Sequence, residues 1–166
     1  MASETEGQDT PGVESELRLT RASRIISAAT GWSVAAGLIP VPILDLAALG
    51  AVQVKMISDL GALYGQPLKK EAVRSAVSVL LGVLVPSQIA GGIAVSSPKL
   101  VPGMGSVIGA VSFSAFGAAA SYAIGKIFVR HFEAGGTIES FQPEFVEEDL
   151  KKEFKAARTR SEPKPA

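Results

Sequence analysis

Few residues in this sequence have the chemistry that catalysis needs. There is one histidine, His131, and there is no cysteine. The lack of cysteine excludes thiolate catalysis and Cys-ligated metal centres, and a single histidine excludes a multi-histidine metal site. No serine lies in a G-x-S-x-G nucleophile motif, and any serine nucleophile would depend on that one histidine as its base. We therefore expect no catalytic site, no metal site and no cofactor.

Nucleotide and nucleic-acid binding are not predicted either. The string nearest to a phosphate-binding loop is YAIGKI, at 122–127, and it lacks both the leading glycine and the final hydroxyl residue of G-x-x-x-x-G-K-[ST]. The formal net charge is zero. A nucleic-acid partner would need clustered cations on a basic surface, so we expect none.

Asp45 is the carboxylate with the least usual setting, because it follows two prolines inside apolar sequence. Pro40 and Pro42 each remove a helical donor and push the preceding residue toward extended geometry. A helix should therefore break near 38–41 and restart after Pro42, which predicts a hairpin turn built by these three residues. Asp45 would then offset the dipole at the start of the new helix. A place on an ion or proton pathway is the alternative.

Long uncharged runs surround these residues, at 25–44, 75–98 and 100–125. A helix needs about 20 apolar residues to cross a bilayer. The chain is 47% hydrophobic but only 6% aromatic, with 17 glycines, a mixture typical of membrane helices. We predict an all-α integral membrane fold of two helical hairpins with three to four apolar helices. Trp32, inside the first run, is expected to pack between helices.

Small residues recur every four positions in the last uncharged run, with Phe113 at the missing position. This ladder consists of Gly105, Gly109, Gly117, Ser121 and Gly125. Small residues at that spacing let helix backbones approach closely in lipid. We predict a helix-packing face, which could also join copies of the chain into a homo-oligomer.

The ends of the chain are polar. The pattern predicts a disordered acidic tail over 1–17, a helical membrane domain over 18–136, an amphipathic helical region over 137–158 and a disordered tail over 159–166. In the amphipathic helix one side carries Val146, Leu150 and Phe154. We expect this side to face a cytoplasmic partner.

The cations set the expected orientation in the membrane. They form three clusters, Arg18 with Arg21 and Arg24, Lys69 with Lys70 and Arg74, and Lys126 with Arg130. Placing all three in the cytoplasm satisfies the positive-inside rule and leaves only Lys99 on the far side. Both termini are then cytoplasmic.

The segment GWSVAAGLIPVPILDLAALGAVQVKMISDLGALYG, at 31–65, followed by the basic KKEAVR, resembles a bacterial family, the domain of unknown function 697. That family includes YcjF-like membrane proteins and the C-terminal regions of some small-GTPase-like proteins. The resemblance covers about 25–136 and is carried by the I-P-x-P-x-x-D turn and the helix after it. It implies membrane association and, in relatives that carry one, coupling to a nucleotide-binding domain.

Three functions fit the sequence. The first is a non-catalytic scaffold or anchor in the bacterial inner membrane that recruits a cytoplasmic partner such as a GTPase. The second is an oligomeric pore or small transporter lined by Asp45, Ser87 and Gln88. The third is a soluble or peripheral helical bundle whose apolar segments pack on one another.

Overall fold

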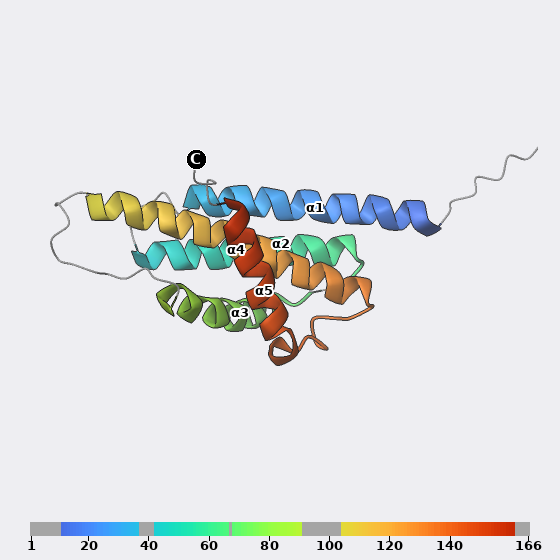
Figure 1. The fold of residues 1–166 in the computed structure, drawn as a ribbon. Helices are drawn as coiled ribbons and strands as arrows, with labels where there is room; N and C mark the ends of the chain where they lie inside the picture. The colour runs from blue at the N-terminus through green and yellow to red at the C-terminus, as the bar shows by residue number, and fades with distance from the viewer. Residues whose placement is uncertain (1–10, 37–41, 67, 91–103, 162–166) are drawn as a thin grey trace, which may run out of the picture.

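A computed structural model describes residues 11–36, 42–66, 68–90 and 104–161, and all regular structure within these ranges is helical. The all-α prediction is therefore confirmed. Figure 1 shows the helices, whose bounds are α1 Pro11–Ala36, α2 Pro42–Leu63, α3 Lys70–Ala90, α4 Met104–Glu133 and α5 Pro143–Ser161.

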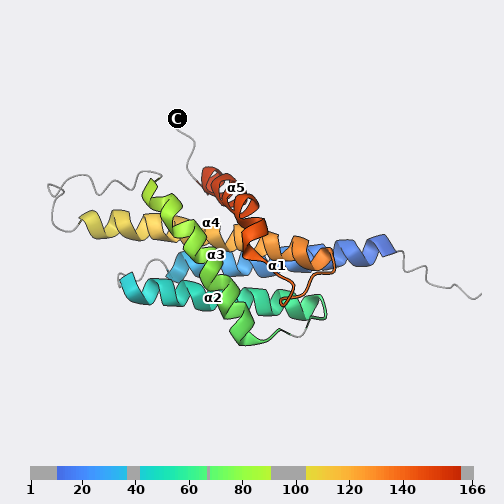
Figure 2. The ribbon, with the colours of Figure 1, turned by 90° about the horizontal axis from the view of Figure 1, so that it is seen from below.

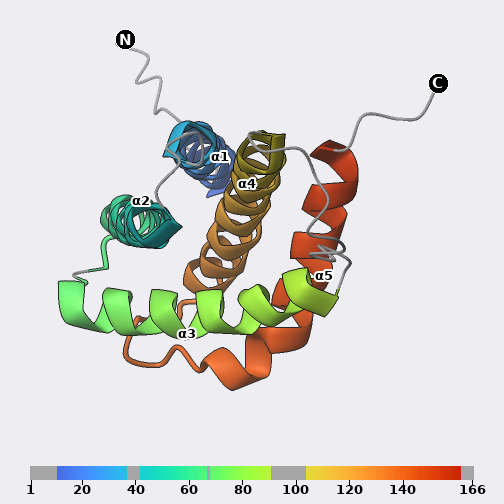
Figure 3. The ribbon, with the colours of Figure 1, turned by 90° about the vertical axis from the view of Figure 1, so that its left-hand side faces the viewer.

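Three long helices run alongside one another, and two shorter helices cross them. Figures 1 and 2 show α1, α2 and α4 extending along the same direction, with α3 and α5 inclined to them. In Figure 3, which looks along the long helices, α3 passes under α2 and α4 while α5 lies on the far side of α4 from α2. The helix α4 therefore lies between α1, α2 and α5.

The first helix begins earlier than the sequence pattern suggested. It starts at Pro11, so the prediction of a disordered tail is wrong for 11–17. Proline is favoured at the first helical position because its fixed φ suits the helix and its missing N–H would have no partner there. Glu14, in the first turn, is favourable at the positive end of the helix dipole.

The predicted break between the first two helices agrees with the helix bounds. One helix ends at Ala36 and the next begins at Pro42. Pro40 lies outside the described residues. Asp45 falls in the first turn of α2 by its position in the chain, but its side chain also lies outside the described part.

Two glycines end helices by adopting a left-handed backbone. Gly65 has a φ of 67°, and Gly135 has a φ of 80°. After α2, the N–H of Gln66 donates to the carbonyl of Gly61 at 2.8 Å and that of Gly65 donates to Ala62 at 3.2 Å. This pair of bonds is a Schellman motif, in which glycine avoids the strain a side chain would cause. It turns the chain from α2 directly into α3.

The core is centred on α4, whose residues are buried almost without interruption from Ser114 to Phe128. Apolar side chains from the other four helices close around it. Fully buried examples are Leu49, Ile57 and Leu60 of α2, Val73, Leu80 and Leu84 of α3, Ile124 and Phe128 of α4, and Leu150 of α5. The part of α4 from Ser114 to Gly125, which carries no charge, is thus buried by protein on most of its circumference.

The expected second hairpin is not a packed pair of helices. The helix α4 packs chiefly against α1 and α5, while α3 packs against α2 and α5 and touches α4 only slightly. The reason lies in the residues of α4, whose small side chains admit α1 and α2 closely. The apolar side of α3 instead packs against α2 and α5.

The expected membrane spans are not seen among the described helices. Within the described ranges, no helix is both long enough and apolar enough to cross a bilayer. The amphipathic helix expected over 137–158 occupies Pro143–Ser161, and it packs across α4 and α3.

Candidate functional site on the two flanks of α2

Part of the small-residue ladder of α4 lies at the contact with α1 and α2. A Cβ added at Gly117 would lie 3.2 Å from the carbonyl oxygen of Ser33, and one at Gly125 would lie 2.6 Å from Cγ1 of Ile26. These positions therefore need glycine for the backbones to approach. Gly105 and Gly109 lie in the first turns of α4, where the side-chain surroundings are not described.

A buried polar cluster joins the three long helices. The hydroxyls of Ser33 and Ser121 lie 2.6 Å apart, and Nε2 of Gln53 donates to the Ser121 oxygen at 2.6 Å. All three residues are buried, and Oε1 of Gln53 has no hydrogen-bond partner among the described residues. The cluster fixes the register of α1, α2 and α4, since a slipped helix would leave buried polar atoms unpaired.

The structure brings His131 to a serine that sequence reasoning did not connect with it. Oγ of Ser140 lies 3.5 Å from Nε2 of His131, but the same nitrogen lies 2.8 Å from the carbonyl oxygen of Thr137. A carbonyl can only accept, so Nε2 carries a proton and cannot serve as a base for the serine. The histidine instead orders the turn after α4. In the described ranges no three His, Cys, Asp or Glu side chains gather as a metal site would require.

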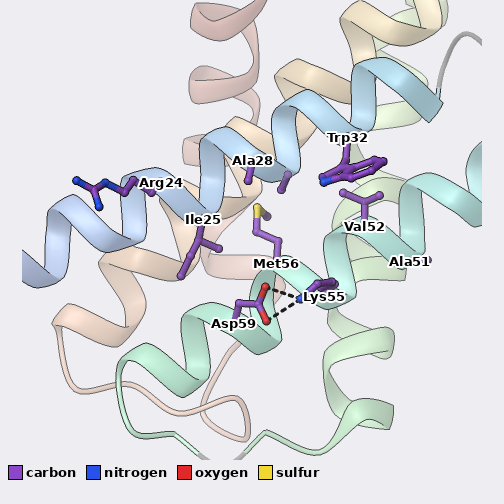
Figure 4. A pocket seen from close by; sticks show the side chains of 10 residues that line it. Arg24, Ile25, Ala28, Trp32, Ala51, Val52, Lys55, Met56 and Asp59 are labelled. Carbon is purple, nitrogen blue, oxygen red and sulfur yellow. Dashed lines mark hydrogen bonds and ion pairs between the residues drawn. The ribbon is translucent and has the colours of Figure 1, made fainter.

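An open groove of about 660 Å³ runs between α1 and α2. Figure 4 shows Trp32 near one end of it and Arg24 near the other, with the ion pair of Lys55 and Asp59 beside Met56 on α2. Trp32 is 70% exposed, so the expectation that it packs between helices is wrong. Most other side chains along the groove are apolar, namely Ile25, Ala28, Ala29, Ala51, Val52 and Met56.

A second groove of about 760 Å³ lies on the opposite flank of α2, where α3 crosses it. It shares Ala51, Lys55 and Asp59 with the first groove. Lys70 and Arg74 of α3 line its other wall. The remaining lining is small or apolar and consists of Ala47, Gly50, Val54, Ser58, Val77, Ser78 and Leu81. We name the two cavities the α1–α2 groove and the α2–α3 groove.

The bundle has one end with little charge, which we call the uncharged end although the first turn of α2 brings Asp45 to it, and one end rich in charge. The last turns of α1 and α3 and the first turns of α4 carry no charged residue, and Figure 1 places them at the same end, on the left. The opposite end holds the first half of α1, the last turns of α2 and the last turns of α4. Both grooves cross the boundary between the two ends.

The apolar side of α5, which was expected to face a partner, lies inside the chain in this structure. Leu150 and Phe154 are buried, and Val146 packs against the same core. The opposite side of α5 is exposed, and its largest apolar residue is Phe145, with 83% of its surface accessible. A partner meeting α5 would therefore encounter Phe145 and charged side chains.

Ion pairs hold α5 against α4. The carboxylate of Glu153 accepts hydrogen bonds from Nζ of Lys126 at 2.9 and 3.0 Å and pairs with Arg130 as well. Burial by itself raises the pKa of Glu153, but its hydrogen bonds and charge pairing with Lys126, and then with Arg130, outweigh it and hold the pKa below its ordinary value.

The grooves were missed by sequence reasoning because they depend on how α1 and α3 pack against α2. One signal was present, since the small residues Ala47 and Ala51 stand four residues apart on α2, one turn before Lys55. Small residues at that spacing make a low ridge, and a low ridge leaves space on each side.

Comparison with known proteins supplies the family. The model of the domain of unknown function 697 matches residues 13–158. The chain therefore belongs to that family, as its proline turn indicated.

A relative with a descriptive name is magnetosome membrane protein 22 of Magnetospirillum gryphiswaldense, which is 37% identical over 126 residues. The match covers 76% of this chain and 65% of the relative, so the chain spans just under two thirds of that protein's length. No solved structure matches the chain.

Proposed function

We propose that this protein is a non-catalytic scaffold or anchor of a bacterial inner membrane, with the uncharged end of the bundle embedded in lipid. A cytoplasmic partner would be recruited to the charged end and to α5. The named relative is a bacterial membrane protein, which supports the membrane location. His131, the single histidine, is engaged in a turn rather than beside a reactive group, which supports a non-catalytic role.

Trp32 carries the proposal. A tryptophan that is 70% exposed at the border of an apolar groove leaves a large apolar surface in water. Exposed apolar patches of this kind mark binding or membrane surfaces, and tryptophan is enriched at membrane interfaces. Val34, Val79 and Val85 are also exposed and lie in the uncharged parts of α1 and α3.

The distribution of cations supports the orientation. Arg18, Arg21 and Arg24 of α1 and Lys126 and Arg130 of α4 belong to the parts of those helices away from the uncharged end. With that end in the bilayer, these cations lie on one side of it. By the positive-inside rule this side is the cytoplasm, so both termini are placed there in the proposal.

The experiment uses Trp32 as a probe, since it is the sole tryptophan of the chain. The full chain is mixed with vesicles whose acyl chains carry bromine, a contact quencher of tryptophan fluorescence. We expect strong quenching and flotation of the protein with the vesicles. The matched control W32F/F145W moves the tryptophan to the exposed side of α5, where we expect flotation without quenching.

Two results would contradict the anchor. A protein that stays unbound and unquenched would have no affinity for the bilayer through this surface. Quenching in the control but not in the natural chain would mean that α5 is the membrane-facing element.

The partner is a separate part of the proposal. Phe145 is the most exposed large apolar residue among those described, and exposed aromatic residues are common binding hot spots. We propose that a GTPase-like protein binds this side of α5. Membranes carrying the natural chain should retain GTP hydrolysis activity from cytoplasmic extract, and the Phe145→Glu variant should not. Equal activity on both membranes would reject this partner site and leave the anchor untouched.

A further inference from the structure

We propose that the α2–α3 groove binds an anionic phospholipid, with the phosphate at Lys70 and Arg74 and an acyl chain along the small and apolar residues toward Leu81. This inference rests on the proposed membrane association and adds the class of lipid and the residues that select it. The α1–α2 groove is lined by two cations, Arg24 and Lys55, and by Trp32. We therefore assign it only nonspecific contact with lipid.

The first argument is charge complementarity. The lining of the α2–α3 groove holds three cations, Lys55, Lys70 and Arg74, against one carboxylate, Asp59. The carboxylate is paired with Lys55 at 2.9 Å. Lys70 and Arg74 form no ion pair within the part of the chain that the structure describes. They stand four residues apart on α3, where like charges repel, and an anion between them would turn that repulsion into attraction.

The second argument is the order of groups along the groove. The turn that follows α2 leads into α3, so Asp59 and Lys70 are the lining residues nearest that turn on their helices, whereas Ala47 and Leu81 are the farthest from it. The groove is therefore cationic toward the charged end of the bundle and apolar toward the uncharged end. A phospholipid around an embedded bundle has the same order, with its phosphate at the boundary and its chains beyond it.

The third argument is size. The groove volume of about 760 Å³ falls within the range of small-ligand sites, about 300 to 1,000 Å³. A groove of this size lined by small and apolar residues can hold an acyl chain. The floor also tolerates being filled, because a Cβ added at Gly50 would meet nothing within 4 Å.

The experiment measures flotation with neutral phosphatidylcholine vesicles and with vesicles that also contain phosphatidylglycerol. The full chain should bind the anionic vesicles more tightly, and K70Q/R74Q should remove about 30-fold of that preference, at roughly 1 kcal/mol per cation. The matched control K152Q/K155Q removes the same charge from the exposed side of α5 and should change binding less than 2-fold. The Gly50→Leu variant, which fills the groove without removing charge, should lower the preference as well.

The lipid site is overturned if K70Q/R74Q keeps the full preference for anionic vesicles. It is also overturned if K152Q/K155Q loses as much of that preference, because general electrostatics would then explain the binding. Full preference in Gly50→Leu would overturn it as well. A dimer that forms with rising concentration and disappears in K70Q/R74Q would assign the groove to a second copy of the chain.

A second measurement separates this inference from the anchor. Phosphatidylglycerol with short acyl chains is titrated as a monomer into the detergent-free protein, with inorganic phosphate as competitor. Saturable binding by the natural chain, lost in K70Q/R74Q and not competed by phosphate, supports the lipid site even if the chain fails to float with vesicles. Flotation and Trp32 quenching without such binding would leave the anchor standing and overturn the site.

Discussion

Gly125 shows how one residue decides the spacing of two helices. The position that a Cβ would take lies 2.6 Å from Cγ1 of Ile26 and 3.2 Å from the sulfur of Met56. Both neighbours are buried, so neither can move without disturbing the core. Overpacking of this kind costs about 1 to 3 kcal/mol.

We predict that Gly125→Ala lowers the free energy of unfolding by that amount. Gly82→Ala is the matched control, because a Cβ there meets nothing within 4 Å, and it should stabilise the protein by about 0.5 to 1 kcal/mol through helix propensity. Denaturant unfolding of the two variants tests this. A loss of stability at Gly82 as large as that at Gly125 would show that packing is not the cause.

Ser121 is the centre of the buried polar cluster, so its removal should leave two other groups unpaired. We predict that Ser121→Ala costs about 1 to 3 kcal/mol, because Nε2 of Gln53 and the Ser33 hydroxyl lose their partner. Replacing all three residues with apolar ones, as S33A/Q53L/S121A, should recover much of that loss, since no buried polar group then remains unsatisfied. Chemical denaturation compares the two. If the triple variant is less stable than S121A, the three polar side chains stabilise the fold by more than satisfying one another's hydrogen bonds.

At the scale of elements, α5 depends on α4 for its position. Its buried residues Leu150 and Phe154 supply the apolar contact, and Phe154 packs edge-on against Phe116 with ring centroids 5.4 Å apart. The ion pairs from Glu153 to α4 lie beside this contact. Their cations are more than 40% exposed, which weakens the pairs through solvent screening.

We predict that Glu153→Gln lowers stability by about 1 kcal/mol at neutral pH. The pKa of Glu153 is lowered in the folded chain, so its contribution is complete above its ordinary pKa, about 4.3, and is lost as the pH falls through the lower folded value. The difference between the natural chain and the variant should therefore shrink below about pH 4. Glu147→Gln, which breaks a pair within α5 alone, is the control. Unfolding curves that differ equally at pH 7 and pH 3 would contradict the assignment.

At the scale of the whole molecule, α4 is the member around which the others pack. Amide exchange should follow this arrangement, because central helices open only in global unfolding whereas peripheral turns open locally. We predict the slowest exchange over 119–132 of α4 and the fastest, among the described helices, over 11–17 of α1. Hydrogen exchange followed by mass spectrometry tests the order. Faster exchange in α4 than in α5 would mean that the bundle does not assemble around it.

The sequence alone determined the helical class, the proline break before α2 and the family. Each of these depends on residues close together in the chain. Hydrophobic periodicity and a proline without an N–H act over a few residues, so their effects can be read directly.

Tertiary structure decided which apolar faces meet, and sequence reasoning failed there for a physical reason. A buried face of α5 and a partner-binding face have the same pattern, so Leu150 and Phe154 could not be assigned to the core from spacing. Trp32 could not be recognised as exposed, and the cations Lys70 and Arg74 could not be assigned to one groove with Ala47 and Gly50. Those placements depend on helices that cross, and the crossing follows from packing small residues of α4 against α1 and α2.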